Sequence, residues 1–118
     1  MRLALPWKDE RGTSSVEFAM AAPAFAAILM GTIEGGLLLW TQSGLQRGAE
    51  MAARCASINP IVCGSETNIQ NYAVQQSLSV NPPPSAFTVA TAACGTQVKA
   101  SYSFQSVVTV TAQACFPK

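Results

Sequence analysis

The sequence predicts an α+β protein in which one long apolar helix leads into a small, disulfide-bonded domain. Three observations predict this fold class. Residues 16–40 are apolar or small at nearly every position, all four cysteines follow this run, and apolar residues alternate with polar ones from residue 86 onward. The expected parts are a charged leader over residues 1–12, a transmembrane and stalk helix over 13–57, and a small extracytoplasmic domain over 58–118.

The composition excludes several classes of function. The 118 residues include 7 Lys and Arg against 6 Asp and Glu, and there is no His. So few charges provide no basic surface for nucleic acid. Without His, the commonest general base and metal ligand is missing, and no pair of nucleophile and activating base can be named. We therefore expect no enzymatic activity, no cofactor, no metal and no nucleic-acid partner.

The apolar run over residues 16–40 is long enough to cross a hydrocarbon core of about 30 Å as a helix. Two carboxylates, Glu17 and Glu34, interrupt it. A charged group at bilayer depth costs roughly 2.5 to more than 10 kcal/mol, so a helix that served only as an anchor would avoid both. Glu34 is expected to face a helix partner or a polar cavity, or else to reach the outer interface near Trp40.

Gly31 and Gly35 form a G-x-x-x-G pair on either side of Glu34. Small residues at this spacing allow a second helix to approach closely. The pattern predicts a helix-packing surface made by Gly31, Glu34 and Gly35. The alternative is chance, because Ala and Gly are abundant in this part of the chain.

Helical spacing continues beyond the apolar run. Glu50 and Arg54 form an i, i+4 ion pair in the favoured order, and Asn59 followed by Pro60 ends the helix. We expect one continuous helix over about residues 14–56, which would form a stalk.

The four cysteines, Cys55, Cys63, Cys94 and Cys115, all lie beyond the apolar run. An even number in a small domain after a membrane helix is typical of two disulfides in an oxidising compartment. Four thiolates could instead bind zinc, but their spacings lack the paired C-x2-C ligands that are usual at zinc sites. Three pairings are possible in principle. The short loop between Cys55 and Cys63 and the strand positions of Cys94 and Cys115 favour these two pairs.

The second half of the chain predicts a short helix and a sheet. The helix is expected over residues 66–78, with a polar start near Ser65 that can cap it. A stiff extended connector with three prolines follows over residues 80–85. The period then changes to two, which predicts three antiparallel strands with one apolar face. Their apolar positions are Phe87 and Val89; Val98, Ala100, Tyr102 and Phe104; and Val108, Val110 and Ala112.

A short motif marks the boundary between the charged leader and the apolar run. It consists of Gly12, four further residues, Glu17 and Phe18, and the sequence runs on as AMAAPAFAAILMGTIEGG. This pattern resembles the cleavage site of class III prepilins and pseudopilins, and it is similar in particular to the TadE-like proteins of the tight-adherence (Flp) pilus. The resemblance is detailed over residues 11–57 and only general in the cysteine-containing tail.

The resemblance implies a minor pilin or pseudopilin that takes part in pilus assembly. A prepilin peptidase would cut between Gly12 and Thr13, and Glu17 and Phe18 would then serve assembly. The implied partners are the peptidase, other pilins and pilus-assembly membrane proteins. The implied location is a bacterial inner membrane, with the N-terminus cytoplasmic and the domain periplasmic or extracellular, or in the pilus itself.

Two alternatives remain at this point. Ser14 and Glu17 have the spacing of a helix capping box, which would explain one carboxylate without a role in assembly. The chain as a whole could instead be an unprocessed, membrane-anchored binding module that recognises a ligand through Tyr102, Phe104 and the proline-rich connector. Cleavage at Gly12 distinguishes the two functions, because a plain anchor has no reason to lose its leader.

Overall fold

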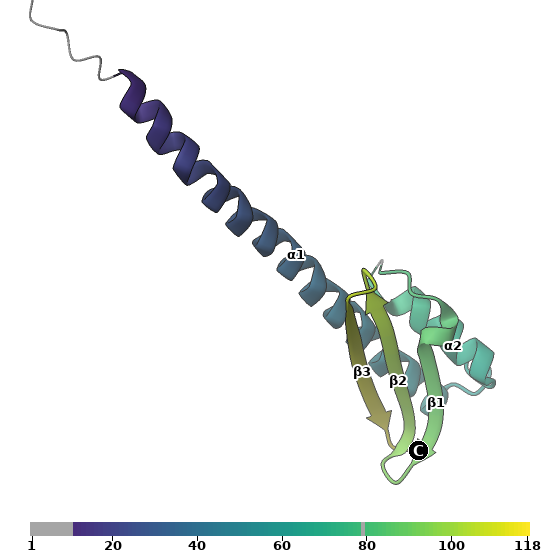
Figure 1. Ribbon diagram of the computed structural model, residues 1–118. Helices are drawn as coiled ribbons and strands as arrows, with labels where there is room; N and C mark the ends of the chain where they lie inside the picture. The colour runs from purple at the N-terminus through teal and green to yellow at the C-terminus, as the bar shows by residue number, and fades with distance from the viewer. Residues whose placement is uncertain (1–10, 79) are drawn as a thin grey trace, which may run out of the picture. The chain divides into compact units, whose positions relative to one another are not determined.

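The computed structural model describes residues 11–78 and 80–118. Its elements in chain order are helix α1 (Arg11–Ile58), helix α2 (Glu66–Gln76), the 3-10 turn η1 (Pro84–Ala86), and strands β1 (Phe87–Ala92), β2 (Gly95–Phe104) and β3 (Val108–Phe116) (Figure 1). These elements confirm the predicted α+β class. The chain divides into two compact units between Gly35 and Gly36, so that α1 contributes to both and the sheet belongs to the second.

The sheet is antiparallel with the order β1-β2-β3. Phe87 pairs with Ala100, and Tyr102 pairs with Val110. Three residues, 105–107, join β2 to β3: Gln105 and Ser106 have φ of 49° and 59°, and the N–H of Val107 donates to the carbonyl of Phe104 at 3.1 Å. Positive φ at both central residues is the signature of a type I′ turn, whose twist matches that of the flanking strands.

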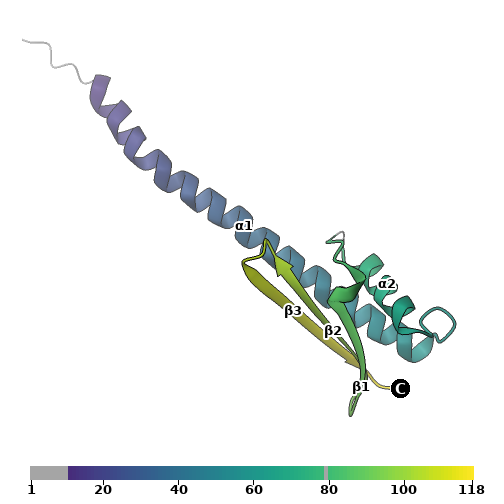
Figure 2. The same ribbon diagram turned by 45° about the vertical axis from the view of Figure 1, so that its right-hand side comes forward.

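Both α2 and the C-terminal half of α1 cover the same face of the sheet (Figure 2). Alternate residues of each strand point into this layer, as the period of two predicts. The half of α1 that the sequence assigns to a stalk is thus part of the core, and its small residues let the sheet lie close. The buried core residues outside the disulfides are Leu45, Ala49, Ala52 and Ala53 of α1, Ile69 and Ala73 of α2, and Phe87, Val98, Ala100, Val110 and Ala112 of the sheet.

Helix α2 begins as the sequence predicts and ends slightly earlier. The backbone N–H of Asn68 donates to the Ser65 hydroxyl at 3.2 Å, which caps the first turn. The expected end at Leu78 is two residues too late, because Leu78 has a φ of 50° that no helix continues through. The buried hydroxyl of Ser77 donates back to the carbonyl of Ala73 at 2.6 Å.

Close packing of α1 against the end of α2 depends on two glycines, Gly44 and Gly48. A Cβ placed on Gly44 would lie 2.6 Å from the carbonyl oxygen of Ser77. One placed on Gly48 would lie 2.5 Å from the Ser77 hydroxyl and 2.8 Å from the carbonyl oxygen of Ala73. Distances this short leave room for hydrogen only, so this G-x-x-x-G pair sets how near the two helices come.

Substituting Gly48→Ala is therefore expected to destabilise the second unit by about 1–2 kcal/mol, because the clash exceeds the gain in helix propensity. Gly36→Ala is the matched control: the same helix meets open space at Gly36, so the propensity term of up to about 1 kcal/mol acts alone and with opposite sign. Urea unfolding of the two full-length variants in detergent measures the change in unfolding free energy that each substitution causes. If Gly48→Ala and Gly36→Ala changed the unfolding free energy equally and in the same direction, the helices would not pack through Gly48.

Two disulfides are present, and both have the pairing that the sequence favours. Cys55 bonds to Cys63, which closes an eight-residue separation just after the end of α1, and Cys94 bonds to Cys115 across 21 residues. The second bond ties the β1–β2 turn to the end of β3. Closing loops of these lengths restricts the unfolded chain, and a stabilisation of about 2–4 kcal/mol per bond is typical.

Candidate functional site

The N-terminal part of α1 has the length, composition and exposure of a membrane anchor. The helix contains an 18-residue stretch with a mean hydropathy of 1.7, which is apolar enough to cross a bilayer, and none of this stretch is buried within the described structure. A core helix of similar composition would be covered by its own domain. The exposed large apolar side chains in this part are Val16, Phe18, Met20, Phe25, Ile28, Leu29, Met30 and Ile33.

The predicted cleavage site lies within the described helix. Gly12 and Thr13 are both exposed, and open space surrounds the position where a Cβ would stand on Gly12. Most of the predicted leader, residues 1–10, lies outside the described residues. The backbone between Gly12 and Thr13 is thus at the surface, where a protease could reach it after local unwinding.

The capping-box interpretation of Glu17 is wrong. Helix α1 already includes Arg11, so Ser14 is an interior helical residue and not an N-cap. Glu17 and Phe18 are both exposed, and no hydrogen bond or ion pair joins Glu17 to another residue within 11–78 and 80–118. The carboxylate of Glu17 is therefore available to a group outside the chain.

The predicted helix-packing surface at Gly31, Glu34 and Gly35 is not covered by any part of the chain that the structure describes. A Cβ on either glycine would meet nothing within 4 Å, and Glu34 is exposed. Within the chain, the close approach that such a pair permits occurs instead at Gly44 and Gly48. Packing of Gly31 and Gly35 against another protein stays a prediction.

Sequence reasoning missed two glutamines that bind the free edge of the sheet. Gln42 donates to the carbonyl of Thr111 at 2.9 Å, and Gln46 donates to the carbonyl of Gln113 at 3.2 Å. Four helical residues advance about 6 Å and two strand residues about 6.7 Å, so one helix can reach alternate carbonyls of one strand. The pair satisfies an edge that could otherwise recruit another strand.

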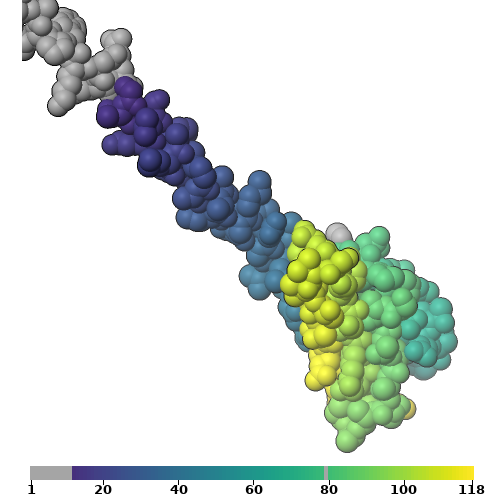
Figure 3. Space-filling view, in the orientation of Figure 1, coloured from purple at the N-terminus to yellow at the C-terminus, as the bar shows by residue number. Residues whose placement is uncertain are grey.

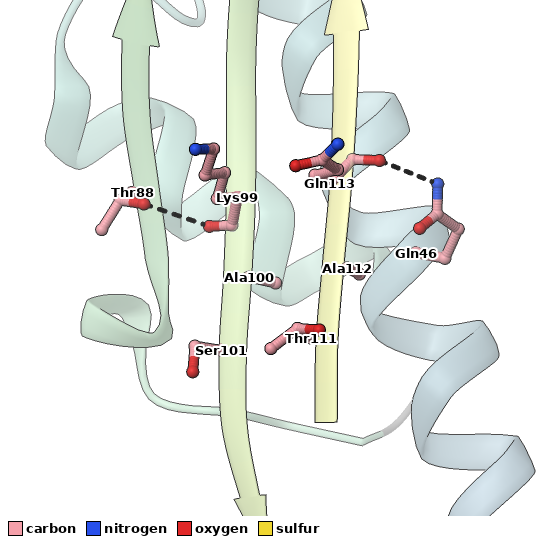
Figure 4. Close-up of a pocket in the computed structure, with 8 residues that line it drawn as sticks. All are labelled: Gln46, Thr88, Lys99, Ala100, Ser101, Thr111, Ala112 and Gln113. Carbon is pink, nitrogen blue, oxygen red and sulfur yellow. Dashed lines mark hydrogen bonds between the residues drawn. The ribbon is translucent and has the colours of Figure 1, made fainter. Parts of the chain in front are cut away.

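A shallow hollow of about 470 Å³ lies on the outer, polar face of the sheet, beside Gln46 (Figure 4). Lys99 is the only charged residue among those that line it. The other lining residues are serine, threonine, glutamine and alanine. The lining therefore contains no acid and base that could work as a pair. Within residues 11–78 and 80–118 there is also no group of three or more His, Cys, Asp or Glu side chains placed to hold a metal.

Comparison with known proteins finds a similarity over part of the chain. Residues 12–54 match the model of the family described as TadE-like protein. This segment is TadE-like. At the level of the family, the match supports a minor pilin associated with the tight-adherence pilus, a structural class of protein and not an enzymatic one. No curated protein and no solved structure matches the chain.

The TadE-like segment starts at Gly12, the first residue of the motif, and ends at Arg54, one residue before the first disulfide. It thus contains the apolar helix together with the part of α1 that packs in the core. Gln42, Gly44 and Gln46 also lie within it. The sheet and both disulfides lie outside the match.

Proposed function

We propose that the protein is a minor pilin or pseudopilin that takes part in assembly of a tight-adherence type IV (Flp) pilus. A prepilin peptidase removes residues 1–12 by cutting between Gly12 and Thr13. The mature chain sits in the bacterial inner membrane with its N-terminus on the cytoplasmic side and its disulfide-bonded domain outside. Its partners are the peptidase, other pilins and pilus-assembly membrane proteins.

The observation that carries this proposal is the TadE-like match that begins at Gly12 and runs through an exposed apolar helix. An apolar surface of this size is not stable in water, so lipid or other helices must cover it. A pilin needs both kinds of cover: lipid before assembly, and neighbouring pilin helices in the filament.

Glu17 has a defined task in this scheme. Cleavage gives Thr13 a new α-amino group, and the Glu17 carboxylate of a neighbouring subunit can pair with it as helices come together. In a medium of low dielectric the attraction is strong and offsets the desolvation of both charges. The pair would fix the axial register of one subunit against the next, while Phe18 adds apolar contact beside it.

Gly31, Glu34 and Gly35 would supply a second contact further along the helix. The two glycines let a partner helix approach, and Glu34 binds a polar group on that partner. Since no residue in the described ranges 11–78 and 80–118 covers this surface, it is available to another subunit.

Gly12→Leu is expected to block removal of the leader. The peptidase must bring its catalytic groups close to the backbone at this position, and a leucine side chain would shield that backbone. The measurement is N-terminal sequencing of membrane-extracted protein from cells with an active prepilin peptidase. Wild-type protein should begin at Thr13, whereas the variant should retain residues 1–12.

Gly36→Leu serves as the control, because it places the same side chain on the same helix outside the motif and in open space. This variant should be cut like the wild type. Wild-type protein that retains Met1 in such cells would contradict the proposal and favour an unprocessed anchored binding module.

A further inference from the structure

A groove lies between the C-terminal part of α1 and helix α2, within the unit of residues 36–118. It consists of two hollows, of about 190 Å³ and about 250 Å³, which share the half-buried side chain of Tyr72. We call the two hollows together the α1–α2 groove. The space-filling view looks onto the outer face of the sheet and shows the teal surface of α2 beside it, so the sheet leaves this helix open on one side (Figure 3).

The first hollow combines apolar walls with one cation. Met51 and Ile58 of α1 and the ring of Tyr72 form its apolar part, and the side chain of Arg54 borders it. No Asp or Glu is among the residues that line it. The hollow thus offers apolar contact and a positive charge, without a carboxylate of its own to balance that charge.

Arg54 has no ion-pair partner within residues 11–78 and 80–118. The ion pair with Glu50 that the sequence predicts does not form, because Oε1 of Glu50 accepts a hydrogen bond from Nε2 of Gln46 at 2.8 Å. The same amide nitrogen also donates to the carbonyl of Gln113 on β3. Gln46 therefore holds the Glu50 carboxylate toward β3, and the exposed guanidinium of Arg54 is available to a carboxylate of another molecule.

The second hollow is lined mainly by side-chain amides. Asn68, Asn71 and Gln75 lie along the exposed side of α2, and Val62 of the disulfide-closed loop completes the lining. These three amides make no hydrogen bond within the described part of the chain. Each has both donors and an acceptor, so the row matches the N–H and C=O groups of a peptide backbone.

We propose that the α1–α2 groove binds a peptide segment of a partner protein, one that presents a carboxylate next to an apolar side chain. The carboxylate pairs with Arg54, the apolar side chain packs on Met51, Ile58 and Tyr72, and the adjoining backbone binds the amides of α2. Arginine and tyrosine are enriched among the residues that dominate binding at protein interfaces. The proposal goes beyond the proposed function and does not depend on it, because it uses only residues that follow the apolar run.

A peptide fits this groove better than a phosphate-bearing lipid does. Phosphate sites usually gather several cations or backbone N–H groups, whereas a single arginine stands here beside apolar side chains. One guanidinium is enough for a carboxylate, which it binds through two parallel hydrogen bonds. A phosphate group would also leave the amides of the second hollow without a partner, and a peptide backbone supplies one.

The first test uses random peptides displayed on phage, selected on immobilised full-length protein in detergent after removal of phage that bind empty micelles. We expect the selected peptides to share an aspartate or glutamate next to a large apolar residue. A selection that yields no binder, or only binders without an acidic residue, would overturn the proposal.

The second test measures the affinity of one selected peptide by fluorescence anisotropy, beside a copy in which the carboxylate is replaced by the amide. Arg54→Gln and the amide copy should each weaken binding about tenfold, as loss of a charged hydrogen bond does. Both changes together should weaken it no further than either alone, because they remove the same contact. Two independent, additive losses would show that the carboxylate does not meet Arg54.

Arg47→Gln is the matched control for charge. Arg47 is an exposed arginine two turns earlier on α1 and does not line the groove. This variant should bind the peptide like the wild type. Equal weakening by both arginine variants would mean a general attraction of charge and would count against the groove. All variants should unfold at the urea concentration of the wild type, because the substituted residues are exposed.

Ile58→Ser and Ile61→Ser test the apolar part of the groove. Ile58 and Ile61 are 61 % and 92 % exposed, and only Ile58 lines the groove. Ile58→Ser should weaken binding about fivefold, since apolar area is no longer covered, and Ile61→Ser should change it little. A larger loss with Ile61→Ser would place the peptide on the disulfide loop. Displacement of the peptide by millimolar glycerol phosphate would favour a lipid headgroup, and either result would overturn the proposal.

Discussion

Replacing Glu17 by glutamine is expected to prevent pilus assembly while insertion and cleavage remain normal. The glutamine keeps the size of the side chain and removes its charge, so the α-amino group of a neighbouring Thr13 would be left unpaired in low dielectric. Breaking a buried ion pair costs about 3–5 kcal/mol. That loss lowers subunit association by more than about a hundredfold.

Three measurements in the same cells test this prediction: blotting for the cleaved form, counting surface pili by microscopy, and crosslinking neighbouring pilins. Glu66→Gln is the control, since Glu66 is an exposed carboxylate in the first turn of α2. It should assemble like the wild type. Normal pili and normal crosslinks with glutamine at residue 17 would remove Glu17 from the assembly mechanism.

Phe87→Ala is expected to destabilise the second unit by about 3–5 kcal/mol, a large share of the 5–15 kcal/mol typical of a whole domain. Phe87 is fully buried where β1 meets both helices. Its ring lies 3.2 Å from the position of a Cβ on Gly48, and its carbonyl accepts a hydrogen bond from Gln70 at 2.8 Å. A cavity here loosens contacts with α1, α2 and the sheet together.

Pulse proteolysis across a urea series, with the full-length protein in detergent, measures this loss. Phe25→Ala is the matched control, because Phe25 is exposed in the apolar part of α1 and contributes nothing to the core. The Phe25 variant should unfold at the urea concentration of the wild type. Similar midpoints for the two variants would mean that Phe87 does not hold the layers together.

The sequence by itself determined the elements of this protein and their order. Hydrophobic periodicity and capping residues are local properties of the sequence. The long apolar run produces α1, the cap at Ser65 starts α2, and the alternation of apolar and polar residues from Phe87 produces three strands. Both disulfide pairs also followed from local placement, at the two ends of a short loop and near the end of a small sheet. Neither prediction needed distances between remote parts of the chain.

Only the tertiary structure decided which residues meet. Two G-x-x-x-G pairs stand on α1, and the sequence singled out Gly31 and Gly35, yet within the chain close packing falls at Gly44 and Gly48, because α2 arrives there. The contacts of Gln42 and Gln46 with β3 likewise depend on where the sheet edge lies. The residue pattern of one helix or strand indicates which of its faces can pack. Which element packs there, and at which residues, depends on parts of the chain dozens of residues away.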